Sequence, residues 1–139
     1  SMATTNLSFK PKQAVKQLLS ALPKRARDVI ESRYGLGKEA KKKTLESIGK
    51  LYGITRERVR QIEDYALQTI RKSDEYASLS AYFDELEALI AGMGGIVSEE
   101  DLLQQLSKET ATQNALHLLL VLGESFVRNK GSPKTLTIA

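Results

Sequence analysis

The sequence predicts a mainly α-helical protein in two parts: a helix-turn-helix domain, followed by a small winged-helix-like domain of three helices and a β-hairpin. Two observations predict this division. Apolar residues recur every three or four positions through most of the chain, between glycines that end helices and Ser or Thr residues that cap them. The net charge also changes sign near residue 73. We therefore expect a disordered lead-in over residues 1–11, a helix-turn-helix domain over 12–73 and a winged-helix-like domain over 74–139.

The first domain shows the boundary residues of four helices. The expected helices run from Lys12 to Leu22, from Pro23 to Tyr34, from a Thr44 cap to about Tyr52, and from a Thr55 cap to about Ile70. A helix of about eight residues, a turn containing Gly53 and a longer helix form the layout of a helix-turn-helix. The apolar stripe of the last helix is expected at Val59, Ile62, Ala66, Leu67 and Ile70.

The last helix of this motif carries a polar face opposite its apolar stripe, concentrated in the first two turns. The members of this face are Arg56, Glu57, Arg60, Gln61 and Asp64. Recognition helices contact base edges mainly with their N-terminal residues. An Arg fork matches guanine, a Gln amide matches adenine, and a Glu carboxylate accepts a hydrogen bond from cytosine. The face therefore suits the reading of a DNA sequence, and the alternative is a solvated helix face of mixed charge.

The two domains differ in charge. Residues 1–73 hold 17 Lys and Arg against 7 Asp and Glu, a net charge of +10, whereas residues 74–139 hold 4 against 10, a net charge of −6. We expect the first domain to attract a polyanion with an affinity that falls with salt. The absence of cysteine excludes disulfides and cysteine-ligated metals and fits a cytoplasmic protein. No catalytic site, metal site or cofactor is expected, because the single His117 cannot build a histidine cluster and the acidic clusters fall on solvated helix faces or at helix starts.

The second domain is predicted to contain three helices and a terminal hairpin. The helices are expected over about 79–90, 98–106 and 112–122, a brief strand at 96–97, and the hairpin strands over 126–129 and 134–138. Residues 74–124 carry ten acids against Lys108 alone and should repel phosphate, whereas the hairpin is basic. We favour the binding of a protein partner, or packing on the basic domain. The alternative is that the hairpin contacts DNA through Arg128, Lys130 and Lys134.

Three stretches of the first domain resemble the C-terminal domain of bacterial primary sigma factors, which recognises the −35 promoter element. They are LPKRARDVIESRYGL over residues 22–36, TLESIG over 44–49, and GITRERVRQIE over 53–63 followed by Ala66-Leu67. Together they cover about 50 residues in the order and spacing of the family. The resemblance implies that the chain binds promoter DNA as part of a sigma factor. It also implies that RNA polymerase is a partner, docked through the flap of its β subunit.

The resemblance assigns roles to individual residues. Arg56, Glu57 and Gln61 match the positions that touch bases. The positions near the DNA backbone are matched by Arg25, Arg33, Thr44, Leu45, Arg58 and Arg60. At Thr44 the role has independent physical support, since the start of a helix attracts phosphate. For Arg25 and Arg33 the alternative is ordinary surface charge.

The chain departs from the family in several ways. Asp64 and Tyr65 stand where the family usually has Ala and a phosphate-binding Lys, and the loop Lys41–Lys43 is more basic than usual. Nothing in the sequence resembles the sigma domains that bind the polymerase coiled coil and melt the −10 element. We therefore expect either a fragment of a sigma factor or a small protein with the −35 reader alone. Two other functions stay open: a stand-alone sigma-like regulator, and an interaction protein that sequesters a sigma factor or polymerase.

Overall fold

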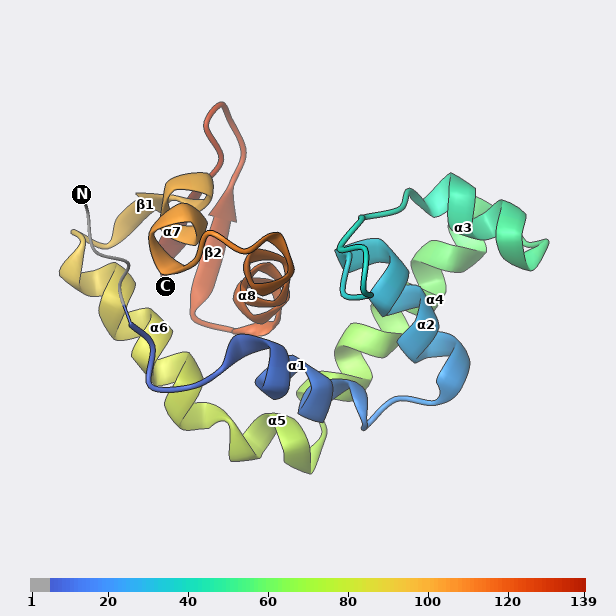
Figure 1. The fold of residues 1–139 in the computed structure, drawn as a ribbon, viewed down its shortest axis with the longest axis horizontal. Helices are drawn as coiled ribbons and strands as arrows, with labels where there is room; N and C mark the ends of the chain where they lie inside the picture. Colours follow the sequence, from blue (N-terminus) through green and yellow to red (C-terminus); the bar gives the residue numbers. More distant parts are fainter. Residues whose placement is uncertain (1–5) are drawn as a thin grey trace.

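The structure, a computed structural model, describes residues 6–139 and folds them into eight helices and one three-stranded sheet (Figure 1). The elements are α1 (Pro11–Leu19), α2 (Lys24–Tyr34), α3 (Leu45–Tyr52), α4 (Arg56–Arg71), α5 (Asp74–Ser78), α6 (Ser80–Gly92), β1 (Ile96–Ser98), α7 (Glu99–Leu106), α8 (Thr110–Leu122), β2 (Phe126–Asn129) and β3 (Thr135–Ile138). The predicted fold class is confirmed: a helix-turn-helix precedes a small winged unit. None of these helices is both long and apolar enough to cross a membrane.

The helix-turn-helix unit is formed by α2, α3 and α4 around a small core of its own. Val29, Ile48 and Val59, one from each helix, are buried together. Helix α2 ends at Tyr34, as the sequence predicts, and the following Gly35 has a φ of 66°, in the left-handed region that suits glycine. The unit therefore folds around contacts between elements that are neighbours in the chain.

The winged unit follows the element order that the sequence predicts, from α6 through β1, α7 and α8 to β2 and β3. Its sheet has the strand order β1–β3–β2 with both pairs antiparallel. Val97 pairs with Leu136 on one side of β3, and Phe126 pairs with Ile138 on the other. The predicted hairpin is confirmed, and the brief strand expected at residues 96–97 is the third strand of the sheet.

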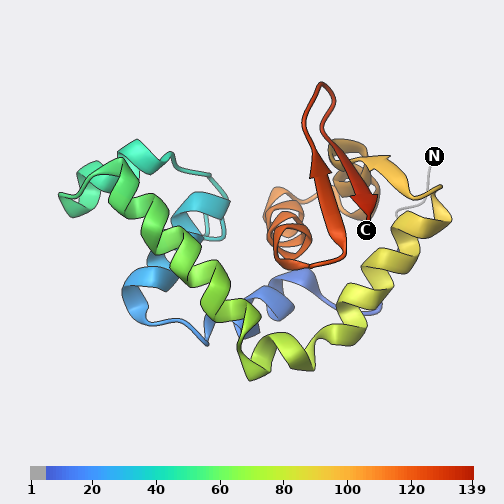
Figure 2. The same cartoon turned by 180° about the vertical axis from the view of Figure 1, so that it is seen from behind.

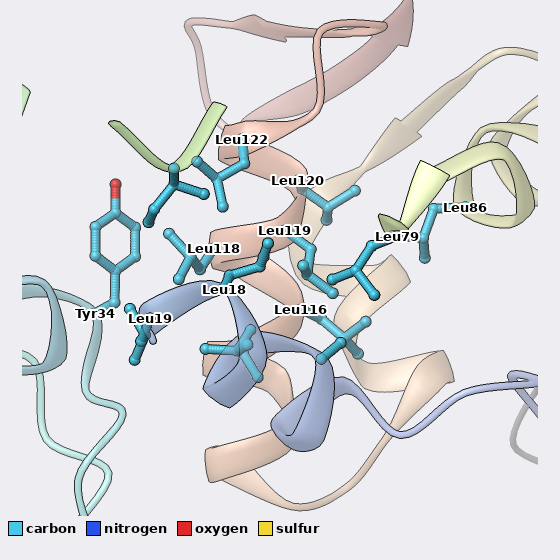
Figure 3. Packing of buried hydrophobic residues seen from close by; sticks show 14 of the residues in the cluster. Leu18, Leu19, Tyr34, Leu79, Leu86, Leu116, Leu118, Leu119, Leu120 and Leu122 are labelled. Atoms are coloured by element: carbon cyan, nitrogen blue, oxygen red, sulfur yellow. The ribbon is translucent and has the colours of Figure 1, made fainter. Parts of the chain in front are cut away.

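Helix α8 lies at the centre of the molecule. Seven of its 13 residues are buried, and helices from both halves of the chain pack against it. Figure 3 shows its leucines among side chains of α1 and the helices around it, including Leu18, Leu19, Tyr34, Leu79 and Leu86. One continuous apolar core therefore spans both halves of the chain.

The start of the chain differs from the sequence-based expectation. Residues 1–5 lie outside the described residues, whereas residues 6–11, expected to belong to a disordered lead-in, contact the winged unit. Phe9 is buried, and its ring stacks on Tyr82 of α6 with the centroids 4.3 Å apart. Burial of this aromatic ring favours an ordered segment, and α1 then begins directly at Pro11.

Helix α1 packs on the winged unit, although the sequence assigned its residues to the helix-turn-helix domain. Its apolar face, formed by Ala14, Val15, Leu18 and Leu19, is buried, and its main neighbour is α8. The turn between Leu19 and Lys24 separates α1 from α2, so that the two helices face different partners. A helical stripe shows that a helix is buried, but it does not identify the surface that buries it.

Hydrogen bonds tie the end of α4 to the end of α8, where the two lobes of Figures 1 and 2 meet. The Leu122 carbonyl accepts from the Arg71 guanidinium and from the Tyr76 hydroxyl, each at 3.1 Å. Arg71 also donates to the Val121 carbonyl at 3.0 Å. These bonds satisfy carbonyls at a helix end that have no partner within the helix. They fix α4 to the winged unit.

Candidate nucleic-acid interface

The turn between α3 and α4 is tight because two glycines permit it. Gly53 adopts a φ of 69°, in the left-handed region. The Gly49 carbonyl accepts from the Ile54 N–H at 2.9 Å, and a Cβ at position 49 would lie only 2.7 Å from the Ile54 carbonyl oxygen. Any larger residue at position 49 would therefore push the turn away from α3. This close approach sets the angle at which α4 leaves the turn.

Both helices of the motif begin at the threonine caps that the sequence predicts. The Oγ1 atom of Thr44 accepts from the backbone N–H of Ser47, and that of Thr55 accepts from Arg58, each at 3.0 Å. Such a cap satisfies an amide that has no partner within the helix and fixes the residue at which the helix starts. Helix α4 therefore starts at Arg56, the first residue of the expected reading face.

The three residues expected to read bases share the exposed side of the first turns of α4. Arg56, Glu57 and Gln61 are all exposed, whereas Val59 is fully buried beneath them. Figure 2 shows α4 running across the near side of its lobe with no other element in front of it. An uncovered helix of this kind can enter a major groove, which is wide enough to admit an α-helix.

Within this face, Arg60 is paired with acids on either side of it. Its Nε donates to Glu57 at 3.0 Å, and its Nη1 donates to Asp64 at 2.8 Å. The hydrogen bond from Arg60 lowers the pKa of Glu57, and that bond in turn raises the pKa of Arg60. Arg58 donates to the Gln61 amide oxygen at 3.2 Å. All these groups are exposed, so their mutual contacts are weak enough to be exchanged for contacts with DNA.

The side chains that are expected to contact the DNA backbone differ in whether they already bind groups within the protein. Arg25 is exposed and lies over the Tyr52 ring, 4.5 Å from its centroid. Arg33 is engaged within the protein: it donates to the Lys43 carbonyl at 3.1 Å and pairs with Glu63 at 3.4 Å. Arg33 thus holds α2, α4 and the loop before α3 together. Of the other expected backbone contacts, Thr44, Arg58 and Arg60 are exposed and Leu45 is half-buried.

Sequence reasoning missed Glu63, an acid that is only 9% exposed on the inner side of α4. Its charge is balanced by Arg33. Burial, with the Glu63 carboxylate nearby, raises the pKa of Tyr34 to about 12. The helical spacing contains the missing signal, because Glu63 follows Val59 by four positions and precedes Ala66 by three. It therefore occupies the buried stripe of α4.

The three basic residues of the hairpin also have different surroundings. Arg128 pairs with the buried Glu99 carboxylate, with Nη1 and Oε2 3.0 Å apart, and His117 Nδ1 lies 2.7 Å from the same carboxylate. Burial raises the pKa of Glu99, but the hydrogen bonds from His117 and Arg128 outweigh this effect and lower the pKa to about 2. Lys130 and Lys134 are exposed near the tip of the hairpin. Arg128 is exposed as well, but its guanidinium is already engaged by Glu99, unlike the side chains that the sequence interpretation requires.

The comparisons with known proteins agree with this geometry. Residues 18–72 match the family described as "Sigma-70, region 4". Similar proteins include RNA polymerase sigma factor SigA1 of Synechococcus elongatus, 48% identical over 65 residues, and the RNA polymerase sigma factors SigA of Nostoc and Synechocystis, each 41% identical over 71 residues. These matches cover 47% to 51% of this chain but only 16% to 18% of each relative. The resemblance of the α2–α4 unit to the −35-recognition region of primary sigma factors is thereby confirmed.

Proposed function

We propose that the protein binds the −35 element of bacterial promoters through α4, as part of a sigma factor or sigma-like initiation protein that acts with RNA polymerase. One observation carries this proposal. The capped and uncovered start of α4, with Arg56, Glu57 and Gln61 on one face, lies within the segment that matches sigma-70 region 4. Its charge and exposure fit a major groove.

In the proposed complex, Arg56, Glu57 and Gln61 contact base edges, whereas Arg25, Arg58 and the start of α3 contact phosphates. Arg60 and Glu57 release each other as the helix enters the groove, because a charge-assisted contact to DNA replaces an exposed ion pair. Arg33 is better described as a support for this surface than as a phosphate contact, since its guanidinium already binds the Lys43 carbonyl and Glu63.

RNA polymerase is the proposed protein partner, because the similar proteins are RNA polymerase sigma factors. The β flap is the part of polymerase that the resemblance implies. In this structure the apolar face of α1 is covered by α8, so this face is not available for a contact with the flap.

A binding experiment with the full chain tests the proposal. Fluorescence anisotropy would compare a labelled duplex that contains a TTGACA-like hexamer with a duplex of scrambled sequence, between about 50 and 200 mM salt. We expect tighter binding to the hexamer at every salt concentration and a steep loss of affinity as salt rises. Equal affinity for the two duplexes at moderate salt would overturn the proposal.

A stand-alone regulator that uses the same surface is the second candidate. The winged unit favours it, because a domain outside the matched residues shares a core and helix-end hydrogen bonds with the DNA-binding unit. Transcription in vitro separates the two functions. Promoter-specific initiation by polymerase with this protein supports a sigma factor, whereas repression or activation of promoters served by another sigma factor supports the regulator.

A further inference from the structure

A buried amide of the winged unit holds the loop that enters the helix-turn-helix. Asn114 on α8 is only 6% exposed, and its Nδ2 donates to the carbonyls of Gly35 at 2.9 Å and Ala40 at 3.1 Å. Both partners are acceptors, so only the amide nitrogen can face them. One side chain of the second unit thus fixes two points of a loop in the first unit, 79 and 74 positions away in the sequence.

The loop that Asn114 holds, residues 35–43, leads directly to the Thr44 cap of α3 and contains Lys41–Lys43. Its shape is unusual at both contact points. Gly35 is left-handed, and a Cβ there would lie 2.7 Å from the Asn114 nitrogen, so glycine is needed for the contact. Ala40 also adopts a positive φ, of 53°, which an L-residue rarely does without support.

The far end of the loop is anchored separately to α2. The Lys43 N–H donates to the Ser32 carbonyl at 2.8 Å, and the Lys43 carbonyl accepts from Arg33 at 3.1 Å. The three lysine side chains are exposed. Asn114 of α8 therefore holds the loop at its start and in its middle, and α2 holds the end that leads into α3. The positive charge of the loop is directed to solvent.

We propose that Asn114 is a positioning residue for DNA binding, which holds loop 35–43 so that Lys41–Lys43 and the start of α3 face the phosphates together. This inference rests on the proposed DNA-binding function and extends it to a residue outside the matched segment. A loop that is already ordered loses less conformational entropy when DNA binds. The acidic winged unit, which should not attract DNA, then raises the affinity for DNA without touching it.

The test compares Asn114→Leu with the unchanged full chain on the hexamer and scrambled duplexes. Leu has the same branched arrangement of four heavy side-chain atoms but donates no hydrogen bond, so both loop carbonyls are left without their donor. We expect affinity for both duplexes to fall by about three- to tenfold and the slope of log affinity against log salt to fall by about 1, with the preference for the hexamer retained. Asn114→Ser, which is shorter and cannot reach both carbonyls, gives the same direction of change if the Leu variant folds poorly.

Two controls separate positioning from a general loss of stability. Leu120→Ala removes buried contacts on the side of α8 away from Tyr34 (Figure 3) and should leave the affinity of the folded protein unchanged. Lys42→Ala should weaken binding in the unchanged protein but have a smaller effect in Asn114→Leu, because the lysine is then no longer held in place. Folding of each variant is checked by circular dichroism at the temperature of the binding assay.

The outcomes distinguish this inference from the proposed function. If the unchanged protein does not prefer the hexamer, the proposed function fails whatever Asn114 does. If it prefers the hexamer but Asn114→Leu binds with unchanged affinity and salt slope, the positioning role is wrong. Fully additive effects of Asn114→Leu and Lys42→Ala would also overturn the positioning role, because independent groups do not couple.

Discussion

Helices α4 and α8 occupy the same place in two successive three-helix units, yet only α4 can enter a groove. Helix α4 carries four arginines, and the side that bears Arg56 and Gln61 is uncovered. Helix α8 carries no Lys, Arg, Asp or Glu, and it is enclosed by α1, α2 and α7. The order of helices therefore does not decide which of them could read DNA, the role that we propose for α4. Composition and the covering elements decide it.

The comparison also explains the charge asymmetry of the chain. The basic unit presents its charge on a helix and a loop, whereas the acidic unit contributes a buried apolar helix on which helices from both halves of the chain pack. The acids of the second unit lie mostly on its outer surface, where they keep that surface away from phosphate. We therefore propose that the winged unit supports DNA binding through packing, not through contact.

Truncation of a leucine in α8 should have the largest effect on the protein. Leu116 is fully buried in the core that both units share, and Leu116→Ala is expected to lower the free energy of unfolding by about 2–5 kcal/mol. Denaturant unfolding, followed by circular dichroism, should show one transition for the whole molecule. The control is Leu51→Ala, at a side chain that is 69% exposed, with an expected change within about 0.5 kcal/mol. Two separate transitions, with the first unit unaffected, would contradict the shared core.

A smaller loss of stability is expected when Glu99 is protonated. Its pKa is about 2 in the folded protein and 4.5 in the reference state, so the folded protein is stabilised above pH 4.5. This stabilisation, up to about 3 kcal/mol, is lost as the pH falls from about 4.5 to about 2. In Glu99→Gln the unfolding free energy should be lower at neutral pH and should change less across this range. An unchanged acid dependence in Glu99→Gln would show that Arg128 and His117 do not stabilise this carboxylate.

The residues of α3 and α4 could be assigned from the sequence because their structure is local. The Thr44 and Thr55 caps, the Gly53 turn and the apolar periodicity act over a few neighbouring positions, and each appears in the structure as predicted. The exposed side of α4 follows from the same periodicity. Glu63 shows the limit of this reasoning, because a rule that places charges on the surface overlooked a charge whose partner, Arg33, lies on another helix.

The relations between distant elements could not be predicted from the sequence. The stripe of α1 indicates a buried face, but the choice of α8 as its partner depends on the packing of the complete core. The contacts of Asn114 with Gly35 and of Arg128 with Glu99 likewise join positions far apart in the chain. Such contacts depend on how the complete chain packs. Composition and local spacing do not show which distant residues will meet.

Substitutions on the uncovered side of α4 should change specificity and not stability. Gln61→Ala is expected to weaken binding to the preferred hexamer by about 1–3 kcal/mol and to relax the preference at one base position. Arg58→Ala should weaken binding to all sequences alike, with a smaller salt slope. Gln104→Ala, at an exposed site on α7, is the matched control and should change neither property. Identical behaviour of the Gln61 and Arg58 variants across a set of hexamer variants would contradict the division into base and backbone contacts.

The smallest effect is expected at the hairpin, where the sequence left a direct DNA contact open. Arg128 is held by Glu99, so Lys130 and Lys134 are the hairpin cations that remain available. If the winged unit acts only through packing, the double substitution Lys130→Ala and Lys134→Ala changes the affinity for the hexamer duplex by less than about twofold and leaves the salt slope unchanged. If either lysine instead binds a phosphate, its removal reduces that slope by about 1. A reduction of that size would place the hairpin on the DNA. The helix-turn-helix unit would then not be the only part that contacts DNA, and the winged unit would do more than support it.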